Sequence, residues 1–332
     1  MATRDETHAD VAVAEQTLED EQRRRVQAGA SAFAAGILTM AGGALAAIVY
    51  SGLPTVPIVD SLRERLGSGE PEPGIKARQV LWYDDNALAL IGISIVLALA
   101  AAAIGLTLVH LYRSTKARRP DLSRFVVYAA VAGSVFVAVA GLVQAIGVSV
   151  EVSSFAGGSD QSSDAAGDVL QSPVVVAALL LRQLGVFALG FAFVLLALNA
   201  MRVGLLTRFM GVLGIIVGVL FIIPLGSSLP IVQAFWLCAL GALFLGKWQG
   251  GLPPAWVTGA AQPWPTQQEL REARMERQAE KADARGGEDT DDDDAPKRRG
   301  RRERADPPET PAPEMPERRP HPSSKKRKRK RR

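Results

Sequence analysis

Six long apolar blocks restrict what this chain can fold into. They cover residues 28–50, 86–112, 125–149, 174–200, 209–226 and 229–246. A helix of about 20 apolar residues spans a hydrocarbon layer of about 30 Å, so blocks of this length are typical of transmembrane helices. The sequence therefore predicts an all-α fold in which six transmembrane helices form a bundle over residues 28–250. A short cytoplasmic segment, residues 1–27, precedes the bundle, and a polar cytoplasmic tail, residues 251–332, follows it.

The lysine and arginine residues beside the blocks predict which way the bundle faces. Positive residues in short loops are retained on the cytoplasmic side of a membrane. They occur before the first block, between the second and third, and between the fourth and fifth: Arg23, Arg24, Arg25, Arg113, Lys116, Arg118, Arg119, Arg124, Arg202 and Arg208. The segment between the third and fourth blocks has four acidic residues and no lysine or arginine. We therefore expect both termini in the cytoplasm. Only the outer segment 51–85 mixes both charges, and its residues 56–66 are expected to form a short helix at the membrane surface.

Arg182 and Gln183 interrupt the fourth apolar block. In one interpretation, Arg182 lies near the outer membrane surface and extends toward lipid phosphate or Glu151. In the other, Arg182 is buried in a polar network, because a charge inside a bundle is tolerated only with a partner and hydrogen bonds. The side chains expected at its depth form a candidate outer-side polar cluster: Arg182, Gln183, Gln144, Asp84, Asp85 and Gln233. Asp85 is the preferred partner of Arg182.

Two roles are open for this polar cluster. It either locks the helices together or lines an outward-facing pocket for a small polar or anionic ligand. The middle of the bundle has no acidic residue of the kind that proton-driven transporters commonly use. Closely spaced glycines predict tight helix packing rather than a hinge. These glycines are Gly185, Gly190, Gly211, Gly214 and Gly218.

Basic and aromatic residues at the inner ends of the helices are expected to contact anionic lipid headgroups. They are Arg113, Lys116, Arg118, Arg119, Arg202, Arg208 and Trp248. Trp248 begins a segment rich in proline and glycine that also contains Trp256 and Trp264. Because indole rings favour the boundary between membrane and water, we expect this segment to lie along the inner face. A docking surface for a partner is the alternative.

The stretch LALNAMRVGLLTRFMGVLGIIVGVL, residues 196–220, contains a loop of the type Arg-x-Gly-Leu-Leu-x-Arg followed by spaced glycines. The residues concerned are Arg202, Gly204, Leu205, Leu206, Arg208, Gly211 and Gly214. This stretch resembles the closing helices of a broad group of uncharacterised bacterial, actinobacterial-type, multi-pass membrane proteins. The resemblance implies a bacterial inner membrane and no particular activity. The chain departs from the group at Thr207, where proline is common, and in its long tail.

The tail carries the basic excess of the chain, with 21 Lys and Arg against 16 Asp and Glu from residue 252 onward. Residues 266–285 are rich in helix-forming residues and predict a solvated helix. The charged runs beyond it lack apolar residues, as disordered segments do. The chain ends in eight cations: Lys325, Lys326, Arg327, Lys328, Arg329, Lys330, Arg331 and Arg332. Three partners are open for them: the acidic run of the tail, anionic lipid of the inner leaflet, or a cytoplasmic protein, ribosome or RNA.

The sequence contains no cofactor motif, no metal site and no catalytic motif, and its one cysteine, Cys238, lies in the sixth block. We therefore expect a non-enzymatic integral membrane protein. The first hypothesis is a scaffold or accessory protein whose polybasic tail contacts anionic lipid or a cytoplasmic partner. The alternative is a carrier or channel for a small polar or anionic solute, with an outer-side site around Arg182.

Overall fold

The computed structural model describes residues 4–54, 75–158, 162–223, 230–249, 251–264, 268–269 and 271–278. All regular structure in these residues is α-helical, which confirms the predicted helical fold class. The helices are α1 (Arg4–Tyr50), α3 (Ile75–Asp85), α4 (Ala87–Arg118), α5 (Phe125–Ala156), α6 (Ser163–Leu170), α7 (Pro173–Arg202), α8 (Arg208–Ile222), α9 (Ile231–Phe244) and α10 (Pro254–Thr258).

Four helices are long and apolar enough to cross a membrane. They are residues Ala12–Tyr50 of α1, and the whole of α4, α5 and α7. The closing helices α8 and α9 have 15 and 14 residues. At 1.5 Å per residue they are about 22 and 21 Å long, which is shorter than a hydrocarbon layer of about 30 Å. Four of the six expected spans thus have the required length, and residues 224–229, between α8 and α9, lie outside the described part of the chain.

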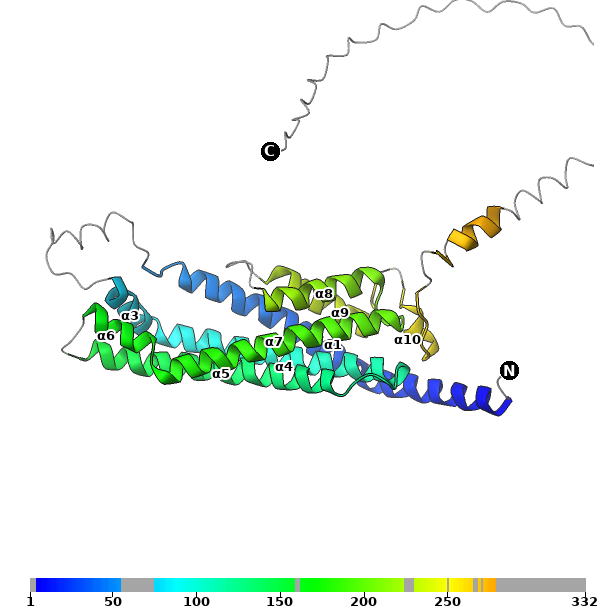
Figure 1. Cartoon of the computed structure of the whole chain (residues 1–332), viewed down its shortest axis with the longest axis horizontal. Helices are drawn as coiled ribbons and strands as arrows, with labels where there is room; N and C mark the ends of the chain where they lie inside the picture. The colour runs from blue at the N-terminus through cyan, green and yellow to red at the C-terminus, as the bar shows by residue number, and fades with distance from the viewer. Residues whose placement is uncertain are drawn as a thin grey trace, which may run out of the picture. The chain divides into compact units, whose positions relative to one another are not determined.

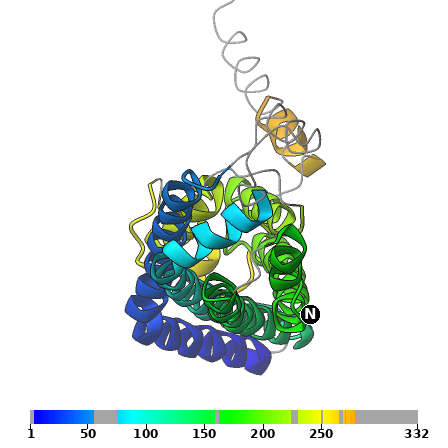
Figure 2. The same ribbon diagram turned by 90° about the vertical axis from the view of Figure 1, so that its left-hand side faces the viewer.

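Six helices of the compact unit at residues 1–266 stand side by side in a ring (Figures 1 and 2). The ring order is α1, α4, α5, α7, α8 and α9, and α9 packs against α1 to close it. We call the end that holds Arg118, at the end of α4, the basal end. The opposite end, with α3 and α6, is the distal end, and Figure 2 looks onto it.

Glycines let neighbouring helices of the ring approach to backbone contact. A Cβ atom on Gly133 of α5 would lie 2.8 Å from the backbone nitrogen of Leu189 and 2.9 Å from the carbonyl oxygen of Gly185, both in α7. A Cβ atom on Gly190 of α7 would lie 2.8 Å from the carbonyl oxygen of Gly218 in α8. No side chain fits at these points. The glycine spacing read from the sequence therefore serves close helix packing, which is typical of membrane bundles.

The outward faces of the long helices are apolar and exposed. Ile37 of α1, Leu99 of α4 and Leu184 of α7 expose 62, 54 and 60% of their surface. A bundle in water would bury side chains of this kind, whereas hydrocarbon solvates them. Together with the lengths of the four long helices, this exterior indicates a membrane protein.

The helices extend beyond the apolar blocks at both ends of the ring. α1 begins at Arg4 rather than at residue 28, and its first turns project past the basal ends of its neighbours (Figure 1). At the distal end, α5 continues to Ala156 and packs with α3 and α6 around Val80, Val152 and Phe155. Apolar block length does not predict α3 and α6. The surface helix expected at residues 56–66 lies outside the described residues.

A strap, residues 251–264, covers the basal loop between α7 and α8. Nε1 of Trp256 donates a hydrogen bond to the carbonyl oxygen of Leu205 at 2.8 Å. Nε1 of Trp264 donates in the same way to Leu206, also at 2.8 Å. The strap does lie at the expected end of the bundle, but these two indole groups bind the protein's own loop instead of marking a lipid boundary.

The conformation of the basal loop depends on a glycine, Gly204, and on a helix-capping residue, Thr207. Gly204 has φ 79°, a left-handed conformation in which other residues are strained, and the strap packs directly against it. Thr207 caps α8, because its hydroxyl accepts a hydrogen bond from the backbone N–H of Met210 at 3.2 Å. Threonine thus caps the start of this helix.

Residues from 267 onward form a second compact unit. Its described residues, 268–269 and 271–278, are helical and fall within the helix expected at 266–285. Residues 279–332, including the terminal eight cations, lie outside the described residues, so the expected disorder of the tail stays a prediction.

Candidate functional site

A cavity of about 670 Å³ lies inside the ring toward its distal end. All six ring helices and α3 contribute to its wall, and most of the wall is apolar. The polar side chains among the described lining residues are Thr39, Tyr50, Tyr83, Ser94, Gln144, Arg182 and Gln233. Arg182 is the one charged residue in this lining. The wall therefore combines a single positive charge, several neutral hydrogen-bonding groups and a large apolar surface.

Arg182 has no counter-ion in the cavity. α7 carries it nine residues from its distal start at Pro173, a distance of about 14 Å. No described residue forms an ion pair or a hydrogen bond with its guanidinium group. Asp85, the expected partner, is exposed at the end of α3 and does not line the cavity. The structure thus leaves Arg182 unpaired where the sequence hypothesis placed it beside Asp85.

The structure brings together three of the six residues of the predicted polar cluster. Gln144 of α5 and Gln233 of α9 line the same cavity as Arg182. Gln183 follows Arg182 directly, and one residue turns a helix by about 100°, so Gln183 lies on another face and does not line the cavity. Both side chains are exposed. Asp84 is half-buried outside the cavity and, with Asp85, stays apart from the other members.

Thr39 is a wall residue that the sequence did not reveal. Its hydroxyl oxygen is buried and has no hydrogen-bond partner within the described residues. Close contacts of α1 with Pro230, which directly precedes α9, and with Ala234 of α9 put Thr39 at about the depth of Gln233. A threonine in an apolar helix usually bonds its own backbone, so its residue type gave no signal. Here its hydroxyl oxygen is a buried, unpartnered polar atom beside the cavity.

Two tyrosines lie at the distal mouth of the cavity. Tyr50 ends α1, and Tyr83 is on α3; both line the cavity. The ring of Trp82 packs 5.9 Å from Tyr50 and 5.3 Å from Tyr83, centroid to centroid. Burial raises the pKa of Tyr83, and the nearby Tyr50 raises it further. Both effects keep the Tyr83 hydroxyl neutral and able to donate a hydrogen bond at the mouth.

The basal side of the cavity is closed by packed aromatic rings. Phe221 of α8 lines the cavity and stacks on Phe193 of α7 at 5.2 Å. Phe193 meets Trp236 of α9 edge-on at 5.4 Å, and both are fully buried. Nε1 of Trp236 donates to the carbonyl oxygen of Met210 at 2.9 Å. The cavity therefore ends on a solid floor and does not continue to the basal end.

Arg118, at the basal end, contrasts with Arg182 because its guanidinium group is fully bound by other groups of the protein. Its guanidinium group forms a two-pronged ion pair with Glu21 of α1, at 2.5 and 3.0 Å. It also donates to the carbonyl oxygens of Ser114 and Ala255, and it stacks over the Trp256 ring at 5.4 Å. The Arg118 side chain is completely buried. The prediction that Arg118 contacts lipid headgroups is wrong, because α1 and the strap enclose it.

Arg119 and Lys116, two of the remaining basal residues, also form hydrogen bonds with the protein. Arg119 donates to the Asn199 side chain at 2.6 Å, and Lys116 donates to the carbonyl oxygen of Leu122 at 3.1 Å. Lipid contact stays a prediction for the others, of which three are exposed and the last half-buried: Arg113, Arg202, Arg208 and Trp248. The described residues contain no group of three or more His, Cys, Asp or Glu that could hold a metal ion.

The distal cavity is thus suited to binding an anion. One guanidinium group, two amides and several hydroxyls can donate hydrogen bonds, and no carboxylate in the described lining competes for them. Comparisons of the chain with protein-family models, with curated proteins and with solved structures each find no match. The function of the cavity is therefore argued from its own residues.

Proposed function

We propose that the chain crosses a bilayer six times with its basal end in the cytoplasm. The exposed cations Arg113, Arg202 and Arg208 at the basal end support this orientation, since positive residues are retained on the cytoplasmic side. In this proposal the short helices α8 and α9 form the fifth and sixth crossings, and they pack against α7 and α1, respectively. A thinner local bilayer would match their length at modest cost in free energy.

The function that the geometry supports best is the binding of a small organic anion, as the outward-facing site of a carrier. One observation carries it: Arg182 lines a mostly apolar cavity without a counter-ion. A positive charge within a membrane bundle is costly unless it is paired, and a bound anion would supply the missing partner. Gln144 and Gln233 can donate further hydrogen bonds to that anion.

The size and lining of the cavity favour an organic anion over an inorganic one. A volume of about 670 Å³ falls in the range of small-molecule pockets, about 300–1,000 Å³. An inorganic ion would meet Arg182 but leave the apolar wall, such as Ile93 and Val186, without contact. A carboxylate or phosphate ester with an apolar body would fill both parts. The aromatic floor at Phe221 supports access from the distal end, which is the outer side in the proposed orientation.

The test compares Arg182→Gln with Arg202→Gln, which removes the same charge from the same helix at its exposed basal end. The probes are octanoate, benzoate and inorganic phosphate, with binding measured by calorimetry on the full chain in nanodiscs and uptake measured in liposomes. We expect at least one organic probe to bind and to enter. Arg182→Gln should weaken its binding about tenfold to a hundredfold, since hydrogen bonds to a charged group contribute about 1.5–3 kcal/mol.

Arg202→Gln should leave binding and uptake unchanged. If both variants bound the organic probe as the unchanged chain does, the carrier proposal would be wrong. Binding without uptake would support the site but contradict the transport step.

A scaffold is the second candidate function, favoured by the eight cations that end the chain, Lys325–Arg332. A polybasic segment of this kind can engage anionic lipid at about 1 kcal/mol per charge, or a cytoplasmic partner. Deletion of residues 296–332 should then abolish localisation or partner capture while the helices still insert. Full retention of both after deletion would exclude this function.

A further inference from the structure

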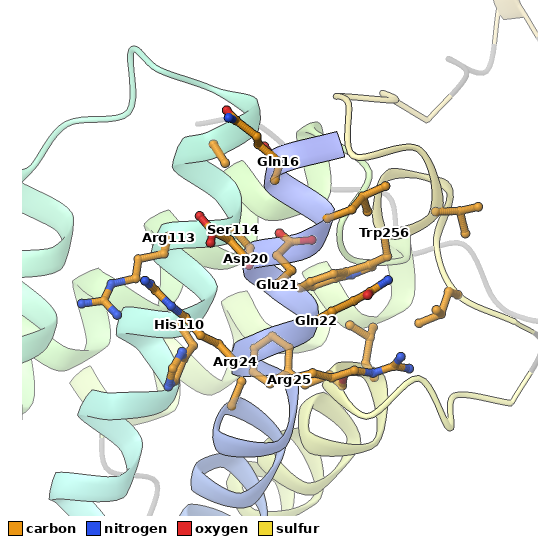
Figure 3. Close-up of a pocket in the computed structure, with 18 of the residues that line it drawn as sticks. Gln16, Asp20, Glu21, Gln22, Arg24, Arg25, His110, Arg113, Ser114 and Trp256 are labelled. Atoms are coloured by element: carbon orange, nitrogen blue, oxygen red, sulfur yellow. The ribbon is translucent and has the colours of Figure 1, made fainter. Parts of the chain in front are cut away.

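We propose that a second pocket, at the basal end, binds a phosphate group through Arg24, His110 and Arg113. This basal pocket has a volume of about 540 Å³ and lies between α1, α4, α9 and the strap (Figure 3). It shares no lining residue with the distal cavity. The proposal therefore does not depend on anion binding at Arg182.

Three basic side chains from two helices face one side of the pocket. His110 and Arg113 are three residues apart on α4, so they share a helix face. Arg24 approaches them from α1, and Figure 3 shows all three side chains grouped away from Trp256 and Arg25. The two guanidinium groups are exposed, and His110 is half-buried. The fold thus gathers basic groups that are distant in the sequence.

None of these three side chains has a hydrogen bond or an ion pair with another described residue. Their neighbours differ in this respect. Arg25 donates to the carbonyl oxygen of Phe244 at 2.9 Å, and Arg118 is fully paired. Structural arginines at the basal end are therefore satisfied by the protein, whereas Arg24 and Arg113 are free to bind an external anion.

The acidic residues of the pocket do not neutralise the three basic groups. Glu21 lines the pocket, but Arg118 holds both of its carboxylate oxygens. Asp20 is one helical turn before Arg24, is exposed, and forms no ion pair with it in the described structure. The side of the pocket with Arg24, His110 and Arg113 thus keeps an excess of positive charge. A dianionic phosphate monoester would match this positive charge, because each guanidinium group can donate two parallel hydrogen bonds to phosphate oxygens.

The depth of these residues matches that of lipid headgroups. The apolar part of α4, from Ala87 to Val109, is about 34 Å long and spans the hydrocarbon layer, so His110 follows at its basal edge. Arg24 lies just before the apolar part of α1 in the same way. The phosphate therefore belongs either to the headgroup of a lipid such as phosphatidic acid or to a soluble phosphate monoester.

The experiment uses the full chain in nanodiscs and compares two charge-matched double variants. Arg24→Gln with Arg113→Gln removes the site, whereas Arg23→Gln with Arg124→Gln removes two exposed basal charges that do not line the pocket. Phosphatidic acid in a phosphatidylcholine background is titrated and its retention is measured by native mass spectrometry. Glycerol 3-phosphate is titrated separately into phosphatidylcholine nanodiscs.

We expect the unchanged chain to retain phosphatidic acid over phosphatidylcholine, and the site variant to bind about 30-fold more weakly. The control variant should bind within about threefold of the unchanged chain, since surface charge alone contributes less than a formed site. Binding of glycerol 3-phosphate with the same dependence on Arg24 and Arg113 would support the site and assign it to a soluble ligand. Equal weakening by both double variants, or no binding of either probe, would overturn the proposal.

Discussion

Arg118 and Arg182 are the same residue type in the same membrane bundle, yet the two ends of the ring treat them in opposite ways. Arg118 is enclosed at the basal end, where Glu21 and two carbonyl oxygens accept all its hydrogen bonds. Arg182 lines the hollow distal half and has no described partner. A charge that the protein satisfies holds the fold together. A charge that the protein leaves unsatisfied is a candidate for binding something else.

The basal and distal halves of the ring also differ in how tightly their side chains are packed. The basal half is filled with large, fully buried side chains such as Phe193, Leu196 and Trp236. In the distal half the same helices diverge around a cavity of about 670 Å³. A bundle selected only for stability would fill such a space, because each void loses dispersion contacts. The distal half therefore has space inside the ring for a bound molecule, whereas large side chains fill the ring interior in the basal half.

The largest expected difference between the halves is in the cost of removing each arginine. Arg118→Ala leaves the partly exposed Glu21 without its partner and two carbonyl oxygens without a donor, so we expect the free energy of unfolding to fall by about 3 kcal/mol. Arg182→Ala removes a charge that has no described partner, and we expect a change under about 0.5 kcal/mol or a gain. Unfolding in mixed micelles, followed by circular dichroism as SDS is added, measures both.

Arg119→Ala is a suitable control, because it loses one hydrogen bond, to Asn199, and should cost about 1 kcal/mol. Equal losses for Arg118→Ala and Arg182→Ala would show that the distal arginine is also structural. The comparison between the two ends would then fail, and with it the main support for the distal site.

A second difference should appear when a leucine is replaced by alanine at each of two positions on α7. Leu196 is fully buried in the basal half, whereas Leu179 lines the cavity and is 49% exposed. Partly unfolded helices remain in hydrocarbon, so only packing is lost, and Leu196→Ala should cost about 2 kcal/mol. Leu179→Ala should cost under about 0.5 kcal/mol. Thermal unfolding in detergent tests this pair; a cost at Leu179 as large as that at Leu196 would mean that the distal half is packed.

Much of the ring could be predicted from apolar block length. The predicted starts at residues 125, 174 and 209 lie within one residue of those of α5, α7 and α8. The blocks did not predict the early start of α1 or the helices α3 and α6, because these elements are stabilised by contacts outside the hydrocarbon. Val152 and Phe155, for example, are buried by α3 and α6 rather than by lipid.

The candidate site was predictable in part. Depth along the helices suggested Gln144 and Gln233 as neighbours of Arg182, since each is a rare polar residue in an apolar block, and all three line the same cavity. Sequence could not separate Arg118 from Arg182, because burial of Arg118 depends on Glu21, which is 97 residues away. The contribution of Thr39 was hidden for a similar reason: its place in the cavity wall depends on how α1 packs against α9.

The smallest change of side chain, one added methyl group, can be made at two glycines of α5. Gly133→Ala forces a Cβ atom against the backbone of α7 at Leu189 and Gly185, so we expect a loss of about 1–2 kcal/mol as the helices separate. A Cβ atom on Gly141, two turns farther along and in the cavity wall, has no neighbour within 4 Å. Gly141→Ala should therefore gain about 0.5–1 kcal/mol, the usual advantage of alanine over glycine in a helix. Opposite signs in matched unfolding experiments would establish that the distal half of the ring has unfilled space, while a loss at both positions would mean that α5 is tightly packed along its whole length.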